Sequence, residues 1–245
     1  MATNIPPHNP SEVIDACISY VDNPDITVEE LMNIVPGPDF PTGALIMGQG
    51  GIRSAYETGK GSIVMRSKAE ILENNNRYQI IFSEIPYQVN KAQLLERVGE
   101  LVREKTIEGI QDLRDESDRD GLRVVVDIKR DADANVILNQ LFRHTRFQTA
   151  FSVNLLALNN GRPEQMGLKQ VISAFVSFRE EVIYKRTRFH LKKARERAHI
   201  LAGLMVALTS IDEVITLIRS APDAETAKKS LTSRAWPVSE IEEFI

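Results

Sequence analysis

The chain has 245 residues, of which 42% are hydrophobic and 26% are charged, and this composition is typical of a globular protein of one or two domains. Its single cysteine, Cys17, excludes an internal disulfide and a cysteine-based metal site, and favours a reducing compartment. No segment is apolar enough to span a membrane, and the N-terminus lacks the basic and apolar regions of a secretory signal. We therefore expect a soluble, cytoplasmic protein with no membrane partner.

Charge is distributed unevenly along the chain, although the formal net charge is only -4. Residues 1–40 carry seven acidic residues and no lysine or arginine, and residues 210–245 carry seven acidic and four basic residues. Residues 41–209 therefore hold 26 basic and 20 acidic residues, a net charge of +6. This central region is the part of the chain in which we expect a polyanion to bind.

Residues 1–40 are predicted to form a domain of two short helices. Asn9 precedes Pro10 in the pattern of a helix start, and Thr27 is followed at the third position by Glu30. The apolar stripes expected to face a core are Ile14, Ile18 and Val21 in the first helix, and Leu31 and Ile34 in the second. Prolines and glycines over residues 36–43 then break the periodicity and mark a linker.

Residues 41–166 are predicted to form an α+β domain. The pattern alternates from residue 61, with Ile63, Met65, Ala69 and Ile71 on one side and Arg66, Lys68 and Glu70 on the other. We expect one half-buried strand here, with a basic outer face. Further strands are predicted at 78–82, 122–128 and 151–158, with a turn at 74–76, and helices at 90–101 and 135–144. These antiparallel strands and the helices between them predict an antiparallel sheet with helices packed on one face.

Residues 167–245 are predicted to begin with one long helix, because no proline or glycine occurs between Gly167 and Gly203. Heptad positions are occupied by Leu168, Val171, Phe175, Phe178 and Val182, and after a phase break by Leu191, Ala194, Ala198, Leu201, Met205 and Leu208. A helix of about 40 residues would be about 60 Å long, and we expect it to project as a coiled-coil arm. Ser210 and Glu213 are predicted to cap the first of the short helices that follow.

Two short motifs resemble ligand sites but lack essential features. Gly48–Gly51 begins like a dinucleotide-binding turn, yet Arg53 occupies the third glycine position and no βαβ pattern follows. An enzyme that binds a nucleotide at this turn remains an alternative. The spacing of a calcium loop is matched by Glu116, Asp118, Asp120, Gly121 and Asp127, but a strand pattern replaces the second helix. We predict no metal site and no catalytic residue in this chain.

A basic surface for nucleic acid is predicted in the central region. Arg66 and Lys68 lie on the outer face of the expected strand, and Arg53 and Lys60 lie near it in the sequence. A rigid sheet can present such cations to a phosphate backbone, so we predict that these four residues bind DNA with little sequence specificity. Residues 179–199 hold eight basic and three acidic residues, for which a solvated helix face is the simpler interpretation.

Five motifs spread over the whole chain resemble the family of DNA gyrase A subunits. They are Met1–Asn9 (MATNIPPHN), Pro36–Gly43 (PGPDFPTG), Glu84–Lys91 (EIPYQVNK), Arg114–Gly121 (RDESDRDG) and Lys192–Leu201 (KKARERAHIL). The resemblance implies a bacterial type IIA topoisomerase, which cuts both strands of one duplex, passes a second duplex through the gap and reseals the break. The related A subunit of topoisomerase IV remains an alternative.

The resemblance also implies a place in the larger enzyme. Residues 1–40 would be the helical end of the winged-helix part of the breakage-reunion region, residues 41–166 the tower domain, and residues 167–245 an incomplete coiled-coil arm. The implied function is to support DNA during ATP-dependent negative supercoiling. The implied partners are double-stranded DNA, the gyrase B subunit, and a second A subunit in an A2B2 assembly. No cofactor is implied for this chain, because ATP and Mg²⁺ would act in the partner subunit.

The catalytic tyrosine of the family is not expected in this chain. In the family it follows an arginine and precedes threonine and glutamate, upstream of the PPHN motif. Arg77 and Tyr78 match the first half of that pattern, but Gln79 and Ile80 follow. We therefore expect this part of the enzyme to be inactive on its own.

Asn4 and His8 lie in the segment that the resemblance places nearest the cleavage site. We therefore expect both residues to lie near DNA. A different class of function remains open beside these predictions, namely a non-catalytic structural or dimerisation module whose basic face is merely solvated.

Overall fold

The computed structural model describes residues 3–74, 77–119 and 121–236. The chain divides into two compact units, Met1–Val176 (unit 1) and Ser177–Ile245 (unit 2). Two details of the sequence predictions, the tip of the turn expected at 74–76 and the acidic residue Asp120, lie outside the described residues.

Two helices begin unit 1, as expected, and the residues predicted to cap them do so. α1 spans Pro10–Asp22, and the Asn9 side chain accepts a hydrogen bond from a backbone N–H of the first turn (3.0 Å). α2 spans Val28–Ile34, where Thr27 and Glu30 form a reciprocal capping box. Such caps satisfy backbone N–H groups that have no partner inside the helix.

The apolar stripe predicted on α1 has the wrong phase. Ile14, Ile18 and Val21 are 58, 54 and 60% exposed. The helix instead buries Ala16 completely and packs Cys17 and Tyr20 against the core. Positions 13, 16, 17 and 20 also follow the 3.6-residue period, so periodicity alone does not decide which of the two faces points inward.

The first sheet of unit 1 has three antiparallel strands, β1 (Leu45–Ile46), β2 (Lys60–Arg66) and β7 (Gln148–Asn154), in the order β1–β2–β7. The core packed on this sheet consists of Ala16, Ile26, Leu31, Val35, Phe40, Ile52, Ala55, Tyr56, Ile63, Met65, Phe151, Val153, Leu155, Leu168 and Ile172. This core draws on residues from the beginning, the middle and the end of unit 1. The first 40 residues therefore share their core with the sheet that follows.

The sequence pattern gives no sign of α3 (Gly50–Thr58), which packs on β2. A Cβ atom built on Gly51 would lie 1.9 Å from the Ser62 carbonyl oxygen, so the helix approaches the strand more closely than a side chain permits. Gly59 ends α3 in the left-handed conformation (φ 77°), which costs glycine little. Gly51 therefore serves the packing of α3 on β2, and Gly59 serves the termination of the helix.

The single strand expected over residues 61–71 is wrong, because the chain leaves the first sheet at Ser67. Ser67 is 1% exposed, and its N–H donates to the Phe147 carbonyl oxygen (2.7 Å). Arg66 ends β2, whereas Lys68 begins a strand of another sheet. Positions of higher and lower exposure continue to alternate through this change of sheet, with Ser67 in the place of an apolar residue, so the sequence pattern conceals it.

The second sheet has four antiparallel strands in the order β3–β4–β6–β5. They are β3 (Lys68–Asn74), β4 (Arg77–Glu84), β6 (Val124–Ile128) and β5 (Ile110–Asp115). β3 and β4 pair as the predicted hairpin. β5, with the sequence IQDLRD, shows no clear alternation of apolar and polar residues, which explains why it is not predicted.

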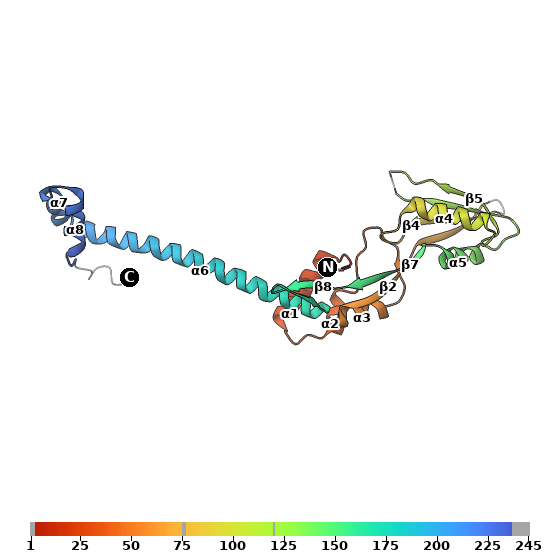
Figure 1. Cartoon of the computed structure of the whole chain (residues 1–245), viewed down its shortest axis with the longest axis horizontal. Coiled ribbons are helices and arrows are strands. Elements are labelled where there is room, and N and C mark those ends of the chain that lie inside the picture. The colour runs from red at the N-terminus through yellow and green to blue at the C-terminus, as the bar shows by residue number, and fades with distance from the viewer. Residues whose placement is uncertain (1–2, 75–76, 120, 237–245) are drawn as a thin grey trace. The chain divides into compact units, whose positions relative to one another are not determined.

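Two helices cover one face of this second sheet, as predicted, and Figure 1 shows them beside its strands. α4 spans Lys91–Arg103 and α5 spans Ala134–His144, and the side chains of Asn90 and Asp133 cap them. The core beneath them consists of Ile80, Phe82, Ile85, Leu94, Val98, Leu101, Ile107, Ile110, Val124, Val126, Ile128, Ala134, Ile137, Leu141 and Phe147. The fold is therefore α+β with antiparallel sheets, as the sequence predicts.

The strand expected over residues 151–158 is two strands, which belong to different sheets. β7 ends at Asn154, and β8 (Leu156–Asn159) forms a separate hairpin with β9 (Arg162–Gln165). Leu155 lies between β7 and β8, and its N–H donates to the Gly59 carbonyl oxygen (2.8 Å). This hydrogen bond ties the base of the hairpin to the end of α3.

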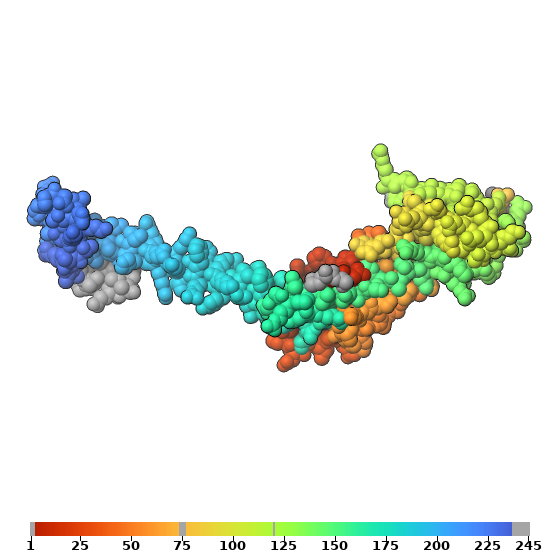
Figure 2. All heavy atoms as spheres, viewed as in Figure 1, coloured from red at the N-terminus to blue at the C-terminus, as the bar shows by residue number. Residues whose placement is uncertain are grey.

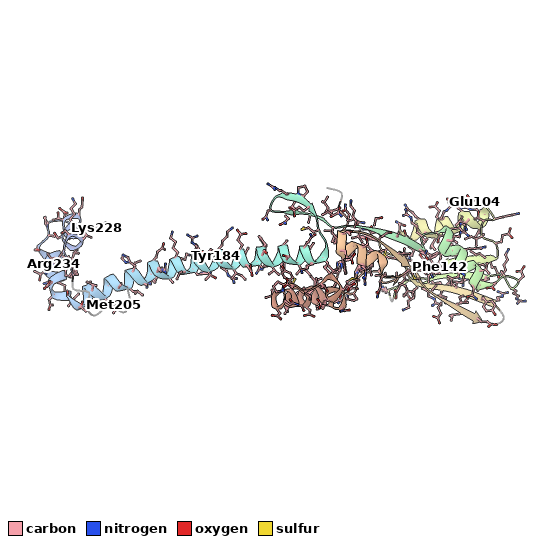
Figure 3. All side chains as sticks on the ribbon, turned by 90° about the horizontal axis from the view of Figure 1, so that it is seen from below. Glu104, Phe142, Tyr184, Met205, Lys228 and Arg234 are labelled. Carbon is pink, nitrogen blue, oxygen red and sulfur yellow. The ribbon has the colours of Figure 1, made fainter. Side chains whose placement is uncertain are left out.

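The long helix predicted after Gly167 is confirmed, because α6 spans Leu168–Thr209 without interruption. Its 42 residues correspond to about 63 Å of helix. Figure 3 shows Tyr184 and Met205 on its surface, where their side chains are 66 and 41% exposed. Among the described residues no single helix is long and apolar enough to cross a bilayer, although α6 and the next helix, α7 (Ile211–Ser220), which are bent by 89° at their junction, together satisfy the length and composition requirement.

Two short helices follow α6 in unit 2, namely α7 (Ile211–Ser220) and α8 (Ala224–Ser233). Ser210 occupies the N-cap position of α7 but makes no side-chain hydrogen bond there, so its predicted capping role is wrong. Asp223 does cap α8, by accepting a hydrogen bond from a backbone N–H of the first turn (2.7 Å).

Candidate nucleic-acid interface

Two of the four cations predicted to bind DNA, Lys60 and Arg66, lie at opposite ends of β2. Because side chains alternate along a strand, positions 60, 62, 64 and 66 share one face, while Ile63 and Met65 are buried on the other. Six residues at about 3.3 Å each separate the two cations by about 20 Å. The strand therefore presents one cation at each end of this face.

Neighbouring side chains engage the Arg66 guanidinium. Its Nε donates to Gln148 Oε1 (2.6 Å), and its Cζ lies 4.8 Å from the centroid of the Phe142 ring. Gln148 is the cross-strand partner of Arg66 on β7, whereas Phe142 belongs to α5 on the second sheet. Arg66 thus links the two sheets of unit 1, in addition to any contact with a phosphate.

Lys68 and Arg53 each face a carboxylate of this chain. Lys68 Nζ lies 3.5 Å from Glu84 Oε1, and Arg53 Nη1 lies 2.8 Å from Glu29 Oε1. These four side chains are 33 to 69% exposed, and surface ion pairs of this kind contribute only about 0–1 kcal/mol. A phosphate can therefore compete for either cation. Lys60 differs, since it has no ion pair in the described part of the chain.

Asn4 lies beside the strand that pairs with Lys60. Its backbone forms an isolated antiparallel bridge with Asn154, and its side-chain Nδ2 donates to the Ser152 carbonyl oxygen (2.6 Å). Asn154 is also the cross-strand partner of Lys60. Asn4 and Lys60 therefore flank the same end of β7. Both pair with Asn154, so two strand spacings, or about 10 Å, separate their backbones. The structure thus brings together two of the residues predicted to lie near DNA.

Two hydrogen bonds hold His8 against the core. Its Nδ1 lies 2.9 Å from the Pro6 carbonyl oxygen, which can only accept, so Nδ1 carries the ring proton. Nε2 then accepts from the hydroxyl of Tyr56 (2.8 Å), a residue that is 2% exposed. Burial lowers the pKa of His8 and raises the pKa of Tyr56. The imidazole is therefore neutral at pH 7 and offers no positive charge to a phosphate.

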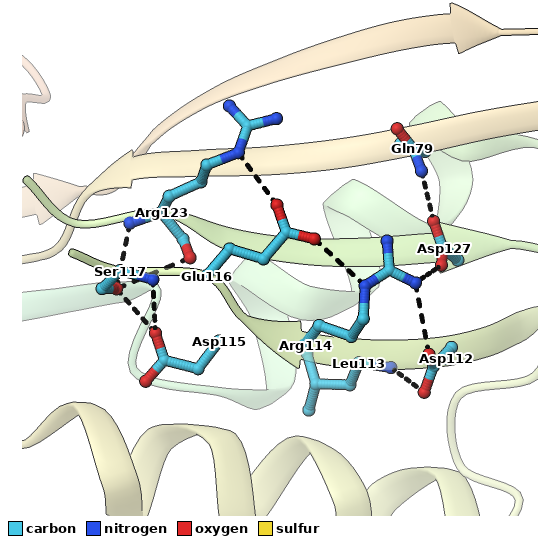
Figure 4. Close-up of polar contacts among 9 residues, drawn as sticks. All are labelled: Gln79, Asp112, Leu113, Arg114, Asp115, Glu116, Ser117, Arg123 and Asp127. Carbon is cyan, nitrogen blue, oxygen red and sulfur yellow. Dashed lines mark hydrogen bonds and ion pairs between the residues drawn. The ribbon is translucent and has the colours of Figure 1, made fainter.

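A network of charged side chains centred on Arg114 lies on the face of the second sheet opposite the helices (Figure 4). Its members are Arg114, Asp112, Glu116, Asp127, Gln79 and Arg123. Hydrogen bonds to Glu116 and Asp127 raise the pKa of Arg114, and hydrogen bonds from the two arginines lower the pKa of Glu116. Two of the residues that match the calcium-loop spacing, Glu116 and Asp127, are therefore engaged in ion pairs with Arg114 and Arg123 on this sheet.

The basic stretch at residues 179–199 of α6 is exposed along its length. Lys185 Nζ lies 2.5 Å from Glu181 Oε1, and Lys192 Nζ lies 3.9 Å from Glu196 Oε1. Both pairs are four residues apart, and each such pair stabilises a helix by roughly 0.2–0.5 kcal/mol. These contacts agree with the interpretation of this stretch as a solvated helix face.

A cleft that the sequence does not predict lies where α4 meets the end of α5. Its volume is about 480 Å³, and it is lined by Asn90, Gln93, Leu94, Arg97, Arg143, His144, Thr145 and Arg146. The signal available in the sequence is the run Arg143–Arg146, which holds two arginines and a histidine at a helix end. The sequence does not indicate that this run lies close to Arg97, because the two are brought together only by the packing of α4 against α5.

Comparison with protein families decides what kind of protein this is. Residues 1–243 match the family described as DNA gyrase/topoisomerase IV, A subunit. The chain belongs to this family. Similar relatives are the A subunits of the DNA gyrases of Granulibacter bethesdensis (58% identical over 242 residues), of Rickettsia conorii (57% over 238) and of Salmonella typhimurium (53% over 243).

The matched gyrase subunits are much longer than this chain. The alignments cover 98, 96 and 98% of the chain but 26, 26 and 28% of the three relatives, so the chain spans about a quarter of their length. Membership of the family of DNA gyrase and topoisomerase IV A subunits confirms the resemblance carried by the five motifs. The relatives are gyrase subunits, so topoisomerase IV is not favoured. The DNA-binding role of Asn4, His8, Arg53, Lys60, Arg66 and Lys68 stays a prediction.

Proposed function

We propose that this chain is the DNA-supporting segment of a gyrase A subunit, in an enzyme that introduces negative supercoils by ATP-dependent passage of one duplex through another. The observation that carries the proposal is the 58% identity to the A subunit of a DNA gyrase over 98% of the chain. Residues 1–40 would end the winged-helix region, residues 41–166 would be the tower domain, and residues 167–245 would begin the coiled-coil arm. The segment itself would hold no catalytic group.

The exposed cations of unit 1 support a role in holding DNA. Lys60 has no ion pair in the described part of the chain, and Lys68 and Arg53 have only exposed ones. Contacts from such cations to phosphates position a duplex without reading its bases, as an enzyme that acts on any duplex requires. Bending a duplex sharply costs about 1–6 kcal/mol, and additional phosphate contacts offset this cost.

The proposed partners are those of a whole gyrase A subunit. They are double-stranded DNA, a gyrase B subunit that binds ATP and Mg²⁺, and a second A subunit in an A2B2 assembly. The exposed apolar residues of α6 support packing against a further helix of the arm, since Phe175, Phe178 and Leu208 are 53, 58 and 68% exposed. We place this assembly in the cytoplasm, in agreement with the single cysteine of the chain.

A reconstituted supercoiling assay tests the proposal. A full-length A subunit that carries this segment, combined with the B subunit, ATP and Mg²⁺, is expected to supercoil relaxed plasmid. The 245-residue chain in place of the full-length protein is expected to give no supercoiling, but to bind a short duplex at low salt. Decatenation without supercoiling would indicate topoisomerase IV instead. A folded chain that does not bind duplex at low salt would favour the structural or dimerisation module.

A further inference from the structure

The cleft between α4 and the end of α5 gathers positive charge in a small volume. Arg97 comes from α4, whereas Arg143, His144 and Arg146 come from the end of α5 and the turn after it. Figure 2 shows the yellow surface of α4 next to the green surface of α5. None of the described residues that line the cleft is acidic. Within the described ranges Arg143 and Arg146 take part in no ion pair, so their charge is not compensated by the chain.

The interaction of cations with the α5 dipole explains the positions of only some of these basic residues. Arg143 and His144 lie in the last turn of α5, where cations interact favourably with the helix dipole. Arg97 differs, because it belongs to the middle of α4 and not to the end of a helix, and Arg146 lies one residue beyond the C-cap of α5. Arg97 Nη1 pairs with Glu100 Oε2 (2.7 Å), which leaves other N–H groups of its guanidinium to donate elsewhere.

The backbone that carries Arg146 is held on both sides by buried residues. The Thr145 hydroxyl donates to the Leu141 carbonyl oxygen (2.6 Å) and accepts from the Phe147 N–H (3.2 Å). Phe147 stacks on Phe82 in the core, with ring centroids 3.7 Å apart. The Cα of Arg146 is therefore fixed before any ligand arrives, and such preorganisation reduces the entropy lost on binding.

The N-terminal end of α4 faces the same cleft, since its cap residue Asn90 and its third residue Gln93 line it. The positive end of the α4 dipole attracts anions, while the Gln93 N–H itself already donates to Asn90 Oδ1 (3.1 Å). Side-chain amides of Asn90 and Gln93 add further hydrogen-bond donors. The cleft thus combines a helix N-terminus with arginines from two helices, and each of these features favours an anion.

We propose that this cleft binds a backbone phosphate of duplex DNA. Arginine guanidinium groups donate two parallel hydrogen bonds to phosphate oxygens, which suits Arg143 and Arg146 to this ligand. The choice of DNA as the source of the phosphate rests on the proposed function of the chain. The site lies apart from the β2 cations that the sequence predicts, and it adds a phosphate contact on the second sheet.

Salt-dependent binding of a short duplex by the whole chain tests this site. The double variant Arg143→Gln/Arg146→Gln removes two charges from the cleft. The matched control Lys129→Gln/Arg162→Gln removes two charges from exposed positions that do not line it. Thermal melting of each variant confirms that it folds like the parent chain.

The cleft variant is expected to bind DNA at least tenfold more weakly than the parent at about 50 mM salt. The slope of log K against log salt is expected to become shallower by about 0.9, because the cleft neutralises one phosphate and each lost phosphate contact accounts for about 0.9. The control is expected to change the slope by less than half as much. An equal change in both variants overturns the cleft site but leaves the proposed function standing. Failure of the folded parent chain to bind duplex overturns both.

A third variant, Arg143→Lys/Arg146→Lys, separates charge from altered structure. It is expected to restore the slope of the parent chain, because the number of charges is unchanged, while its affinity stays below that of the parent because lysine cannot form the bidentate fork. A slope that remains as shallow as that of the glutamine variant would overturn the phosphate contact, since loss of charge would then not explain the weaker binding.

Discussion

The Arg66 guanidinium lies 4.8 Å over the ring of Phe142, and this contact joins the end of β2 in the first sheet to α5 on the second. Phe142 in turn meets Phe82 of the second core edge to face, with ring centroids 6.3 Å apart. A residue that the sequence marks as a free surface cation is therefore part of the connection between the two sheets of unit 1.

A double-mutant cycle on Arg66 and Phe142 measures this contact. Arg66→Met and Phe142→Leu are expected to show a coupling free energy of about 0.5–1 kcal/mol, the usual strength of a cation over an aromatic ring at a partly exposed site. Urea denaturation of the two single variants and the double variant gives this value. The same cycle with Arg53→Met is expected to be additive, because Arg53 contacts Glu29 instead. Additivity in the first cycle would show that the contact contributes nothing in solution.

Lys60 is expected to matter more for DNA binding than Lys68. Lys60→Gln should make the slope of log K against log salt shallower by about 0.9, because a free ammonium group releases one counterion equivalent on meeting a phosphate. Lys68→Gln should change the slope less, because Lys68 Nζ already lies 3.5 Å from Glu84 Oε1. Fluorescence anisotropy of a labelled duplex over a salt series measures both. Equal slopes for the two variants would mean that the ion pair with Glu84 does not compete with DNA.

The sequence predicts those parts of the fold whose secondary structure depends on interactions between residues close together in the chain. The capping box of Thr27 and Glu30 and the helix start at Asn9 depend on residues two or three apart, and both occur as predicted. The uninterrupted helix after Gly167 is predicted because a long run without proline or glycine permits little else. These local preferences, taken together, suffice for the α+β class.

The parts that the sequence does not predict depend on contacts between distant residues. Ser67 marks the change of sheet only because Phe147 and the strand after it lie alongside. Ile14 and Ala16 lie on alternative faces of α1, and the choice between those faces is made by the core that the helix meets. The candidate site follows the same rule, since the cleft forms only where α4, which carries Arg97, meets the turn after α5, which carries Arg146.

The imidazole of His8 is expected to make the chain less stable in acid. Burial lowers its pKa below the ordinary value of 6.5, so the folded chain binds this proton less readily than the unfolded chain. The contribution of His8 to stability is therefore complete above pH 6.5 and is lost as the pH falls through the lowered pKa of the folded state. Thermal melting between pH 7 and about pH 5 should show a smaller decrease for His8→Gln than for the parent chain. A titration of the His8 ring by NMR with a midpoint at or above 6.5 would contradict this prediction.

The two adjacent glycines at the start of α3 are expected to respond in opposite ways to alanine. In Gly51→Ala the new methyl group would lie 1.9 Å from the Ser62 carbonyl oxygen, and this backbone atom of β2 cannot move without disturbing the sheet. We expect the free energy of unfolding to fall by about 3 kcal/mol, at the upper end of the usual cost of overpacking. In Gly50→Ala the methyl group meets no atom within 4 Å, so we expect no loss and a gain of up to about 0.5 kcal/mol from the reduced freedom of the unfolded chain.

Urea denaturation of the two alanine variants measures this difference under identical conditions. Similar effects at both positions would show that α3 stands away from β2 in solution. The expected difference would establish that Gly51 is required by the close approach of helix and strand. A dinucleotide site at Gly48–Gly51 makes a separate demand, because a bound nucleotide must raise the melting temperature. We expect no such rise, since the backbone at Gly51 is already in contact with β2 and is not open to a phosphate.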